Sequence, residues 1–434
     1  YAVREALGAL QKNLRHYGSE LLVLDAEAVT ALSRLQEQFA VTAIYSHQET
    51  GLTHTYERDK AVAAWCAQSG VRWIELPHNG VVRPLYDRDA WQQQFLLAMQ
   101  RPRVPIPRPL ALPPSLRTAI KAAPQPTLTV ARDTSDVPEV GERAAHDTLN
   151  DFLTKRGVGY AGGVSSMNTA PTACSRLSVH LAWGTLSLRT AFQRTNARLQ
   201  ELPRDGSAKQ WRRSLRAFQS RLFWHAHFTQ KLEDEVSLEF TPANRAFHET
   251  LPVVSGAELT NRLAAWEAGE TGFPMIDATM RYYNRTGWVN FRSRAMLTSF
   301  AVHALRVPWQ TILYSLAQKM IDYVPGIHVT QTQMQTGVTG TNTIRVYSPM
   351  KQMTDHDPEA HFIKRNVSEL AHFSAAEIAN FQAQPLGDYI APIIDFKAET
   401  KLMKDALYDI KKSAQGQREA ARVYHKHGSR REAN

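Results

Sequence analysis

Apolar positions recur at two different spacings along this chain, and the spacing changes near residue 145. In residues 1–100, short apolar runs alternate with segments whose apolar positions repeat every three to four residues. This alternation predicts strands and helices in turn. The expected helices are 1–17, 26–39 and 56–68, and the expected strands are 21–24, 41–45 and 71–76. The order is typical of an α/β doubly wound parallel sheet, which binds ligands at the carboxyl ends of its strands.

After residue 145 the pattern is almost entirely helical. The expected helices are 146–155, 175–183, 186–198, 210–231, 258–269, 275–285, 292–305, 309–321, 358–366 and 398–424. Two polar stretches, 157–172 and 325–349, interrupt the series and are expected to be loops. Polar loops inside a helical domain tend to carry function.

The two patterns are separated by a proline-rich segment. Nine of the 22 prolines fall between Pro102 and Pro138, and this segment has little periodicity. It predicts a linker partly in polyproline II form, wrapped over the surface. The expected organisation is an α/β domain at 1–100, a linker at 101–145 and an all-α domain at 146–434.

Segment 270–325 combines a strongly amphipathic helix with charges that a core does not normally accept. Its arginines Arg285, Arg292 and Arg294 lie close to an apolar repeat that runs from Met296. Buried charges need partners, so this segment should face a polar ligand or an acidic neighbour. Asp322 is the candidate partner within the chain.

Composition narrows the class of protein. The 434 residues are 43% hydrophobic and 21% charged, which is ordinary for a globular protein. The net charge of +10 and a pI of about 9.5 favour a polyanionic partner, with nucleic acid first and an acidic membrane surface second. A basic protein without such a partner has the same composition.

The cysteine count and the apolar runs exclude several further classes. With only two cysteines, the chain is not expected to contain a disulfide framework, a cysteine-rich zinc site or a four-cysteine iron–sulfur cluster. The low cysteine count is typical of a protein in the reducing cytoplasm. No apolar run of about 18 residues exists, so the chain is not expected to enter a membrane. The chain starts at Tyr1 without Met, and a natural N-terminus upstream is expected.

Common catalytic motifs are missing from the sequence. There is no GxGxxG, P-loop, HExxH or GxSxG. His47, Glu49 and His54 follow an expected strand, but polar loop residues are the simpler interpretation than metal ligands. The run 355–357 (DHD) precedes Pro358, where N-capping of the next helix is favoured over metal binding. No metal site is predicted.

Two other segments leave alternatives open. In 173–180 (ACSRLSVH), Ser175 sits at an expected helix start, which can bind a phosphate or simply receive an N-cap. In 218–231, aromatic residues mix with Arg221 and His225. That mixture suits stacking on exposed bases, but it equally fits an amphipathic helix that buries its aromatics.

Three separated segments, in the right order, resemble one family. These are TACSRLSVHLAWGTLS at 172–187, TGFPMIDATMRYYNRTGWVNFRSRAMLTSF at 271–300 and NTIRVYSPMKQMTDHDPEAHFIKRNVSEL at 342–370. They are similar to the flavin-binding segments of DNA photolyases and cryptochromes. The stretches IYSHQETG and ELPHNGVVR resemble the family's α/β antenna domain, whose first strand is expected to lie upstream of Tyr1. The resemblance covers essentially the whole chain.

The resemblance implies an FAD site in the helical domain. Arg294 and Asp322 match an ion pair that spans the isoalloxazine ring, where Arg294 would stabilise a reduced anionic flavin. His328 occupies the position that faces flavin N5. The other positions that match FAD-binding residues are Tyr160, Cys174, Ser175, Leu177, Ser178, Trp288 and Arg292. A second, antenna chromophore of the folate or deazaflavin type is possible.

The sequence departs from the family at several of these positions. His328 stands where photolyases usually have Asn, and an imidazole that titrates near neutral pH could tune the flavin. Val324 replaces an acidic residue, and Phe291 replaces the Asn expected before Arg292. These changes affect the surroundings of the flavin ring.

Further departures lie in the lesion pocket and on the electron route. Trp224 matches a stacking Trp, but Arg221 replaces the dimer-binding Glu and Met334 replaces a second aromatic residue. Of the three tryptophans that carry electrons to the flavin, only Trp309 has a counterpart. Thr332 replaces the Trp nearest the flavin.

The family reaction implies a light-driven, monomeric DNA repair enzyme of the deoxyribodipyrimidine photo-lyase type. In that reaction, excited reduced FAD passes an electron to a pyrimidine dimer flipped out of DNA, and the electron returns after the dimer splits. The departures keep an alternative open, a cryptochrome-like flavin photoreceptor without repair activity. A structural DNA binder with a vestigial pocket is a third interpretation.

Overall fold

Two parallel strands form the sheet of the N-terminal domain. The computed structural model describes residues 1–106, 112–123, 126, 136–248 and 251–429. In the N-terminal part the elements are α1 (Ala2–His16), α2 (Ala28–Phe39), β1 (Ala43–His47), α3 (Thr53–Ser69), β2 (Arg72–Leu76) and α4 (Trp91–Gln100). Strands β1 and β2 pair in register from Ala43 with Arg72 to His47 with Leu76. The predicted α/β class is therefore confirmed, with a small parallel sheet.

The prediction of a strand at 21–24 is wrong. These residues have no regular secondary structure, and the first of them bonds to α1 instead of to a strand. The backbone N–H of Leu21 donates to Gln11 Oε1 at 2.7 Å, and Arg15 pairs with Glu20 at 3.0 Å. The buried Glu20 carboxylate also lies 3.5 Å from Arg117 and 3.4 Å from Lys121. This segment is thus tied to the preceding helix, α1, and to Arg117 and Lys121 rather than to the sheet.

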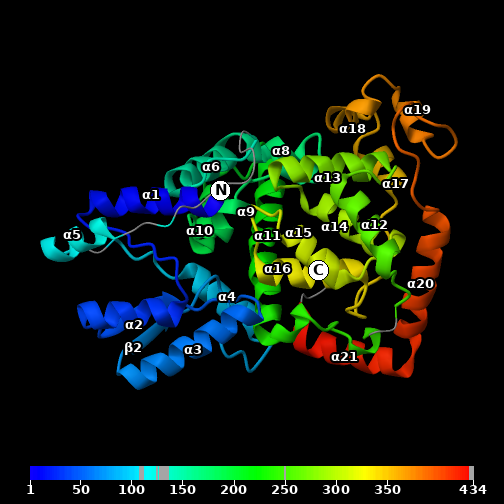
Figure 1. Ribbon diagram of the computed structural model, residues 1–434. Coiled ribbons are helices and arrows are strands. Elements are labelled where there is room, and N and C mark those ends of the chain that lie inside the picture. Colours follow the sequence, from blue (N-terminus) through cyan, green and yellow to red (C-terminus); the bar gives the residue numbers. More distant parts are fainter. Residues whose placement is uncertain (107–111, 124–125, 127–135, 249–250, 430–434) are drawn as a thin grey trace.

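The predicted linker is partly helical. Helix α5 (Pro114–Ala122) lies inside it, and the helical domain begins within its last residues. Of the predicted linker, residues 107–111, 124–125 and 127–135 lie outside the described residues. In Figure 1, α5 lies beside α1, at the edge of the molecule away from the helical domain.

The C-terminal part is a helical domain, as predicted. Its elements are α6 (Glu142–Thr154), η1 (Arg156–Gly159), α7 (Tyr160–Gly163), α8 (Ala170–Ala173), α9 (Ser178–Ala182), α10 (Leu188–Glu201), α11 (Lys209–Asp234), η2 (Val236–Glu239), η3 (Arg245–Phe247), α12 (Gly256–Ala268), α13 (Pro274–Thr286), α14 (Phe291–Ser299), the π-helical turn η4 (Phe300–Ala304), α15 (Trp309–Ala317), α16 (Pro325–Thr336), α17 (Pro349–His356), α18 (His361–Asn366), η5 (Ser368–Leu370), α19 (Ala375–Ala379), α20 (Phe396–Lys412) and α21 (Ala414–His427). Among the described residues, no helix combines the length and apolar character needed to cross a bilayer.

Helix α16 lies where a polar loop was predicted over 325–349. Pro325 occupies its first turn, and Gly337 ends it with a φ of +90°, a conformation that favours glycine. The threonine hydroxyls bond to carbonyls one turn back, from Thr330 to Gly326 at 2.7 Å and from Thr336 to Thr332 at 2.8 Å. These hydroxyls are therefore satisfied within a buried helix, which is why a composition rich in threonine misled the prediction.

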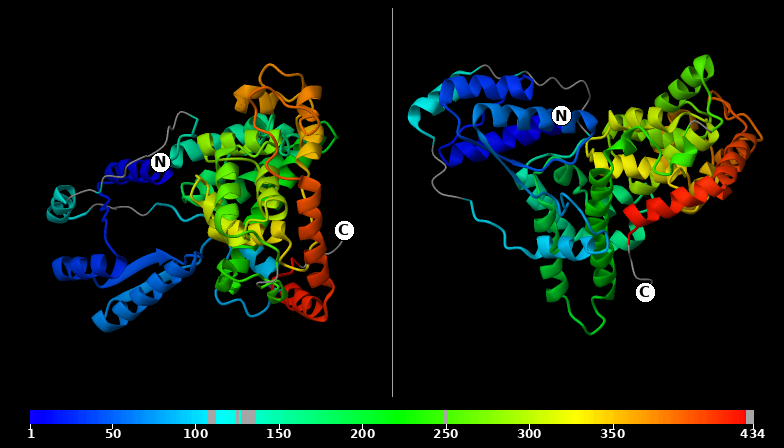
Figure 2. Two further views of the ribbon diagram at one scale, coloured as in Figure 1. Left: turned by 45° about the vertical axis from the view of Figure 1, so that its right-hand side comes forward. Right: turned by 90° about the horizontal axis from the view of Figure 1, so that it is seen from below.

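The single helix predicted over 398–424 is two helices, α20 and α21. Ser413 between them has an extended backbone, and its hydroxyl accepts from the Gly416 N–H at 3.0 Å. This cap starts a new helix in a different direction, so that α21 crosses beneath the domain (Figures 1 and 2).

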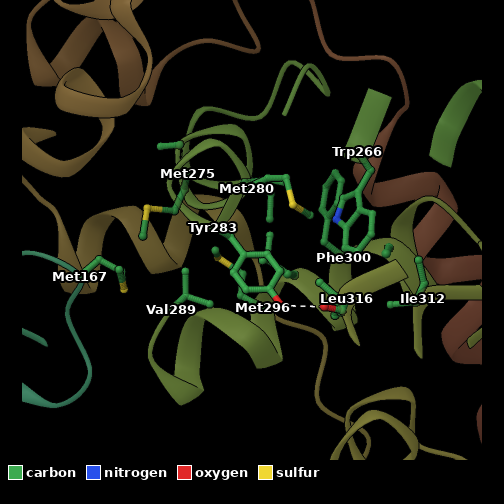
Figure 3. Packing of buried hydrophobic residues seen from close by; sticks show 14 of the residues in the cluster. Met167, Trp266, Met275, Met280, Tyr283, Val289, Met296, Phe300, Ile312 and Leu316 are labelled. Carbon is green, nitrogen blue, oxygen red and sulfur yellow. Dashed lines mark hydrogen bonds between the residues drawn. The ribbon is translucent and has the colours of Figure 1, made fainter. Parts of the chain in front are cut away.

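The main core lies between α12, α13, α14 and α15. Trp266, Tyr283 and Phe300 are fully buried there, and the Tyr283 hydroxyl donates to the Leu316 carbonyl at 2.7 Å (Figure 3). The amphipathic segment predicted over 270–325 thus supplies the centre of the core. Its apolar face fixes α14, which carries two of its arginines, Arg292 and Arg294, to one side.

Helix α11 connects the two domains. It is 26 residues long and packs against α16 so closely that a Cβ on Gly326 would lie 2.5 Å from Thr229 Cα. Near its C-terminus, Glu233 accepts hydrogen bonds from Thr50 Oγ1 at 2.9 Å and from the Tyr56 hydroxyl at 2.7 Å. Arg83 pairs with the same carboxylate. The α/β domain is therefore held on the same helix that forms one wall of the cavity described next.

Candidate functional site

A cavity of about 980 Å³ lies inside the helical domain. Its walls come from α11, α14, α16, the segment before α9 and the end of α21. Of the predicted site residues, those that line it are Tyr160, Cys174, Ser175, Ser178, Arg221, Trp224, Trp288, Arg292, Arg294, Asp322, His328 and Met334. Residues that are far apart in the sequence are thus brought to one space that is large enough for a cofactor.

Arg294 and Asp322 form the ion pair expected from the sequence. Arg294 Nη2 donates to both oxygens of Asp322, at 2.8 and 2.7 Å. The Asp322 side chain is 2% exposed and that of Arg294 is 24% exposed. Burial works against the charged guanidinium, but Asp322 outweighs it, so the pKa of Arg294 is raised. Arg294 therefore stays charged in the cavity wall, with the Asp322 carboxylate as its counter-charge.

The segment 174–178 forms a second part of the wall. Arg156 holds its backbone by donating to the carbonyls of Cys174 and Ser175. The start of α9 differs from the expectation, because the helix begins at Ser178 and Ser175 accepts only a long bond of 3.4 Å from the Leu177 N–H. Burial raises the pKa of the Cys174 thiol to about 11, so this residue is a neutral wall group. Leu177 is fully buried in the neighbouring core and does not line the cavity.

Two arginines of the cavity have nitrogen atoms without a protein partner. Arg176 Nη1 and Arg292 Nε are buried, and neither makes a hydrogen bond within the described part of the chain. The Arg176 guanidinium lies over the Trp288 ring at 3.7 Å from its centroid, in a residue whose φ is +59°. Buried donors of this kind normally have a partner. Their position and charge suit the diphosphate of a dinucleotide.

His328 is neutral, contrary to the expectation that it titrates near pH 7. Burial lowers its pKa to about 4. Its Nε2 lies 2.7 Å from the Leu313 carbonyl, which can only accept, so Nε2 carries the proton and Nδ1 is left as an acceptor. The ring also contacts Tyr323, with centroids 5.7 Å apart.

Aromatic and basic residues of α11 form the outer part of the cavity. Trp224 stacks on Phe228 with ring centroids 5.5 Å apart and planes 23° apart. Arg221 is exposed, and its guanidinium lies near the hydroxyl of the buried Tyr160. Burial raises the pKa of that hydroxyl to about 12. Some aromatics of this segment are packed, as expected for an amphipathic helix, while Trp224 and Arg221 line the cavity, and stacking on bases stays a prediction.

Trp309 is not brought to this site. It begins α15, is 5% exposed in the main core and does not line the cavity. Its role as an electron carrier stays a prediction. The polar run at 355–357 acts as expected for a cap, because the Asp357 carboxylate accepts from the backbone N–H groups of Phe362 and Ile363, both at 3.0 Å.

Several cavity residues were not selected from the sequence. Gln331, Lys231 and Arg345 line it, together with Tyr424 and His427 of α21. Burial, with Arg88 nearby, lowers the pKa of Lys231 to about 8. No motif distinguishes these residues, and α21 reaches the cavity only because the chain turns at Ser413. In all, the cavity wall has six Lys or Arg side chains and, among described residues, one carboxylate, Asp322.

Comparison with known proteins identifies the family. The sequence pattern of the FAD binding domain of DNA photolyase matches residues 218–409, and that of DNA photolyase matches residues 2–87. A deoxyribodipyrimidine photo-lyase from Synechococcus is 26% identical over 95% of this chain and 87% of its own length.

Solved structures share the fold. A bacterial class III photolyase from Agrobacterium tumefaciens has a TM-score of 0.78 at 21% identity, over 95% of this chain and 88% of its own. A cryptochrome from Synechocystis has a TM-score of 0.77 at 18% identity, over 93% and 87% of the two chains. With its FAD-binding domain, its α/β domain and the cavity between α11, α14 and α16, this chain belongs to the photolyase/cryptochrome family.

Proposed function

We propose that this chain is a light-driven DNA repair enzyme of the deoxyribodipyrimidine photo-lyase type, with FAD in the central cavity. The observation that carries the proposal is the continuity of the cavity. The same space contains the Arg294–Asp322 pair, the unpartnered arginine nitrogens and, nearer its mouth, Trp224. The full-length similarity to a protein named deoxyribodipyrimidine photo-lyase supports the same activity.

FAD fits the residues present. Arg176 and Arg292 would hold the diphosphate, and Arg294 with Asp322 would lie against the flavin ring. When bound and reduced, FAD supplies the light-excited electron that splits a pyrimidine dimer. The contribution of the chain is electrostatic, because Arg294 keeps its charge at every physiological pH and stabilises negative charge at the ring. Neutral His328 offers Nδ1 as an acceptor without adding a charge.

DNA is the proposed partner, and the surface beside the cavity fits it. Residues 189–221 contain nine Lys or Arg against two Asp or Glu, a large part of the net charge of +10. On α11, Lys209, Arg213 and Arg216 are exposed at spacings of four and three, so they lie on one face of the helix. Their side chains make no hydrogen bond or ion pair with the described residues. The same face continues one turn at a time through Ser220 to Trp224, at the cavity.

The test is a repair assay on the purified protein. FAD-loaded, reduced protein is mixed with single- or double-stranded DNA that contains pyrimidine dimers, and the dimers are counted after blue light or darkness. Loss of dimers that requires both light and FAD is the expected result. Unchanged dimers under blue light, with the flavin fully reduced, would overturn the proposal.

A cryptochrome-like photoreceptor is the second candidate. Arg221, Thr332 and Met334 favour it, because they replace residues that photolyases use for the dimer and for electron transfer. It predicts FAD binding without dimer repair, together with a light-dependent change in limited proteolysis. An identical proteolysis pattern in light and darkness would argue against it.

A further inference from the structure

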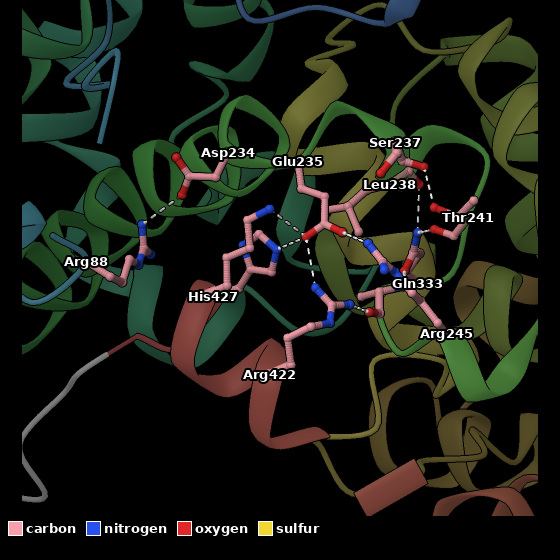
Figure 4. A network of polar contacts seen from close by, with 12 residues as sticks. Arg88, Asp234, Glu235, Ser237, Leu238, Thr241, Arg245, Gln333, Arg422 and His427 are labelled. Carbon is pink, nitrogen blue, oxygen red and sulfur yellow. Dashed lines mark hydrogen bonds and ion pairs between the residues drawn. The ribbon is translucent and has the colours of Figure 1, made fainter. Parts of the chain in front are cut away.

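Two glutamines of α16 that are two residues apart have opposite surroundings. Gln333 is satisfied by the protein, since its Oε1 accepts from the Ala243 N–H at 2.6 Å and its Nε2 donates to the carbonyls of Leu238 at 2.6 Å and Thr241 at 2.8 Å (Figure 4). Gln331 is 8% exposed and lines the cavity, and neither its Nε2 nor its Oε1 has a partner among the described residues. Residues two apart point to opposite sides of a helix, so one amide stabilises the fold and the other faces the cavity.

A buried amide without partners is unfavourable, because it has lost its hydrogen bonds to water. The amide of Gln331 must therefore gain its partners from whatever fills the cavity. Unlike Arg176 and Arg292, which can only donate, an amide offers one acceptor and a neighbouring donor. The ligand group that it faces should present the complementary pair.

A second neutral group in the cavity has the same character. His225 on α11 has two buried ring nitrogens, and neither has a partner among the described residues. Burial, with His78 nearby, lowers the pKa of His225 to about 4, so the neutral ring has one donor and one acceptor nitrogen. The cavity thus offers cationic donors for phosphates and, separately, neutral donor–acceptor groups for a heterocycle.

We propose that Gln331 binds an imide edge, an N–H next to a carbonyl, of a ligand in this cavity. That edge occurs on the pyrimidine-dione ring of a flavin and on a thymine base. Gln331 would then set specificity in a pocket where Arg221 and Phe291 replace the Glu and Asn expected there. If the imide edge belongs to a thymine base, the inference rests on the proposed function in DNA repair. If it belongs to the flavin ring, the inference does not depend on repair.

The experiment compares Gln331→Met with its matched control Gln333→Met. The first arm measures FAD retention through gel filtration and the flavin absorption spectrum. The second arm measures affinity for an oligonucleotide with one thymine dimer and for the same oligonucleotide without it. Thermal unfolding of both apoproteins reports the structural role.

Gln331→Met should leave apoprotein stability unchanged or higher. It should weaken either the binding of FAD or the binding of the thymine-dimer oligonucleotide by about tenfold. A tenfold loss is the usual effect of losing a hydrogen bond in a binding site. A weaker or spectrally shifted FAD complex assigns the imide to the flavin, and lost discrimination for the dimer assigns it to thymine. Gln333→Met should destabilise the apoprotein and leave both FAD retention and the affinity for the thymine-dimer oligonucleotide unchanged.

Gln331→Glu is a second variant if Gln331→Met fails to fold, because it keeps the size and the acceptor but removes the donor. The inference is overturned if both folded variants at position 331 bind FAD and dimer DNA as the unmodified protein does. Failure of the proposed function is a separate result, since it would appear as absent repair in the unmodified protein, whereas the flavin arm still reports on Gln331.

Discussion

Glu235 and Asp322 are both buried carboxylates of the helical domain, but their surroundings differ. Glu235 is enclosed by four basic side chains, with His427 Nε2 at 2.9 Å, Lys426 at 3.1 Å, Arg422 at 3.4 Å and Arg245 at 3.9 Å (Figure 4). Among the described residues, Asp322 has a single ion-pair partner, Arg294, and both residues line the cavity.

The charges around Glu235 stabilise the fold, whereas the charges around the cavity are placed to bind a ligand. The groups around Glu235 join α21 to the end of α11, and each of the four basic side chains pairs with its carboxylate. The groups around the cavity include several polar atoms that have no partner in the part of the chain that the structure describes, on Arg176, Arg292 and Gln331. A position of the first kind should affect stability when it is changed, whereas one of the second kind should affect binding.

Asp322→Asn should have the largest effect, because it acts on both properties. It leaves the Arg294 guanidinium without its counter-charge in a largely buried site. We expect a loss of about 2–3 kcal/mol in the free energy of unfolding, less than the usual loss of about 3–5 kcal/mol because part of Arg294 is exposed. FAD should no longer be retained through gel filtration. Chemical unfolding of the apoprotein and flavin absorbance measure the two effects, and a variant that keeps normal FAD would contradict the assignment of the pair.

Glu235→Gln should lower stability by about 1–2 kcal/mol, since several of its partners are partly exposed. It should also make the α20–α21 junction more sensitive to protease. FAD retention should fall much less than in Asp322→Asn. Equal loss of FAD in the two variants would erase the distinction between the two carboxylates.

The lowered pKa of Glu235 predicts that the stability of the protein depends on pH in the acid range. Burial acts to raise the pKa of Glu235, but the hydrogen bonds from His427 and Lys426 outweigh it and hold the pKa at about 2, below the ordinary value of 4.5. Because the folded-state pKa is lower, this stabilisation is complete above pH 4.5 and is lost as the pH falls from 4.5 toward 2. Unfolding measured across this window should therefore be less steeply pH-dependent in Glu235→Gln than in the unmodified protein. Identical pH profiles would show that Glu235 does not contribute.

The basic face of α11 should give the smallest change, one confined to DNA. Reversing Lys209, Arg213 and Arg216 to Glu should leave FAD binding and stability nearly unchanged. The slope of log affinity against log salt for duplex DNA should fall by about 2–3, at roughly 0.9 for each phosphate contact. The control reverses the exposed Lys397, Lys404 and Lys412 of α20, which lie outside the cavity. An equal fall of the slope in the control would show that net charge, and not the position of these residues, causes the effect.

Much of the fold was predictable because it depends on local patterns. The helical domain followed from apolar periodicity, and the Arg294–Asp322 pair followed from the rule that buried charges need partners. Helix α16 was not predictable in this way, since Thr330 bonds to a carbonyl within the helix and Gln333 bonds to a distant group, the Ala243 N–H. The roles of Gln331 and Gln333 differ only through tertiary contacts, and the neutral state of His328 follows from burial, which the sequence does not show.

The most direct test of this account is the absorption spectrum of the purified protein after the apoprotein is mixed with FAD and passed through gel filtration. The account predicts that FAD elutes with the protein at one molecule per chain, with flavin bands altered from those of free FAD. It further predicts that Asp322→Asn elutes without FAD while Glu235→Gln retains it. A folded, unmodified protein that elutes without FAD would contradict the central claim that the cavity's unpartnered groups form the flavin site.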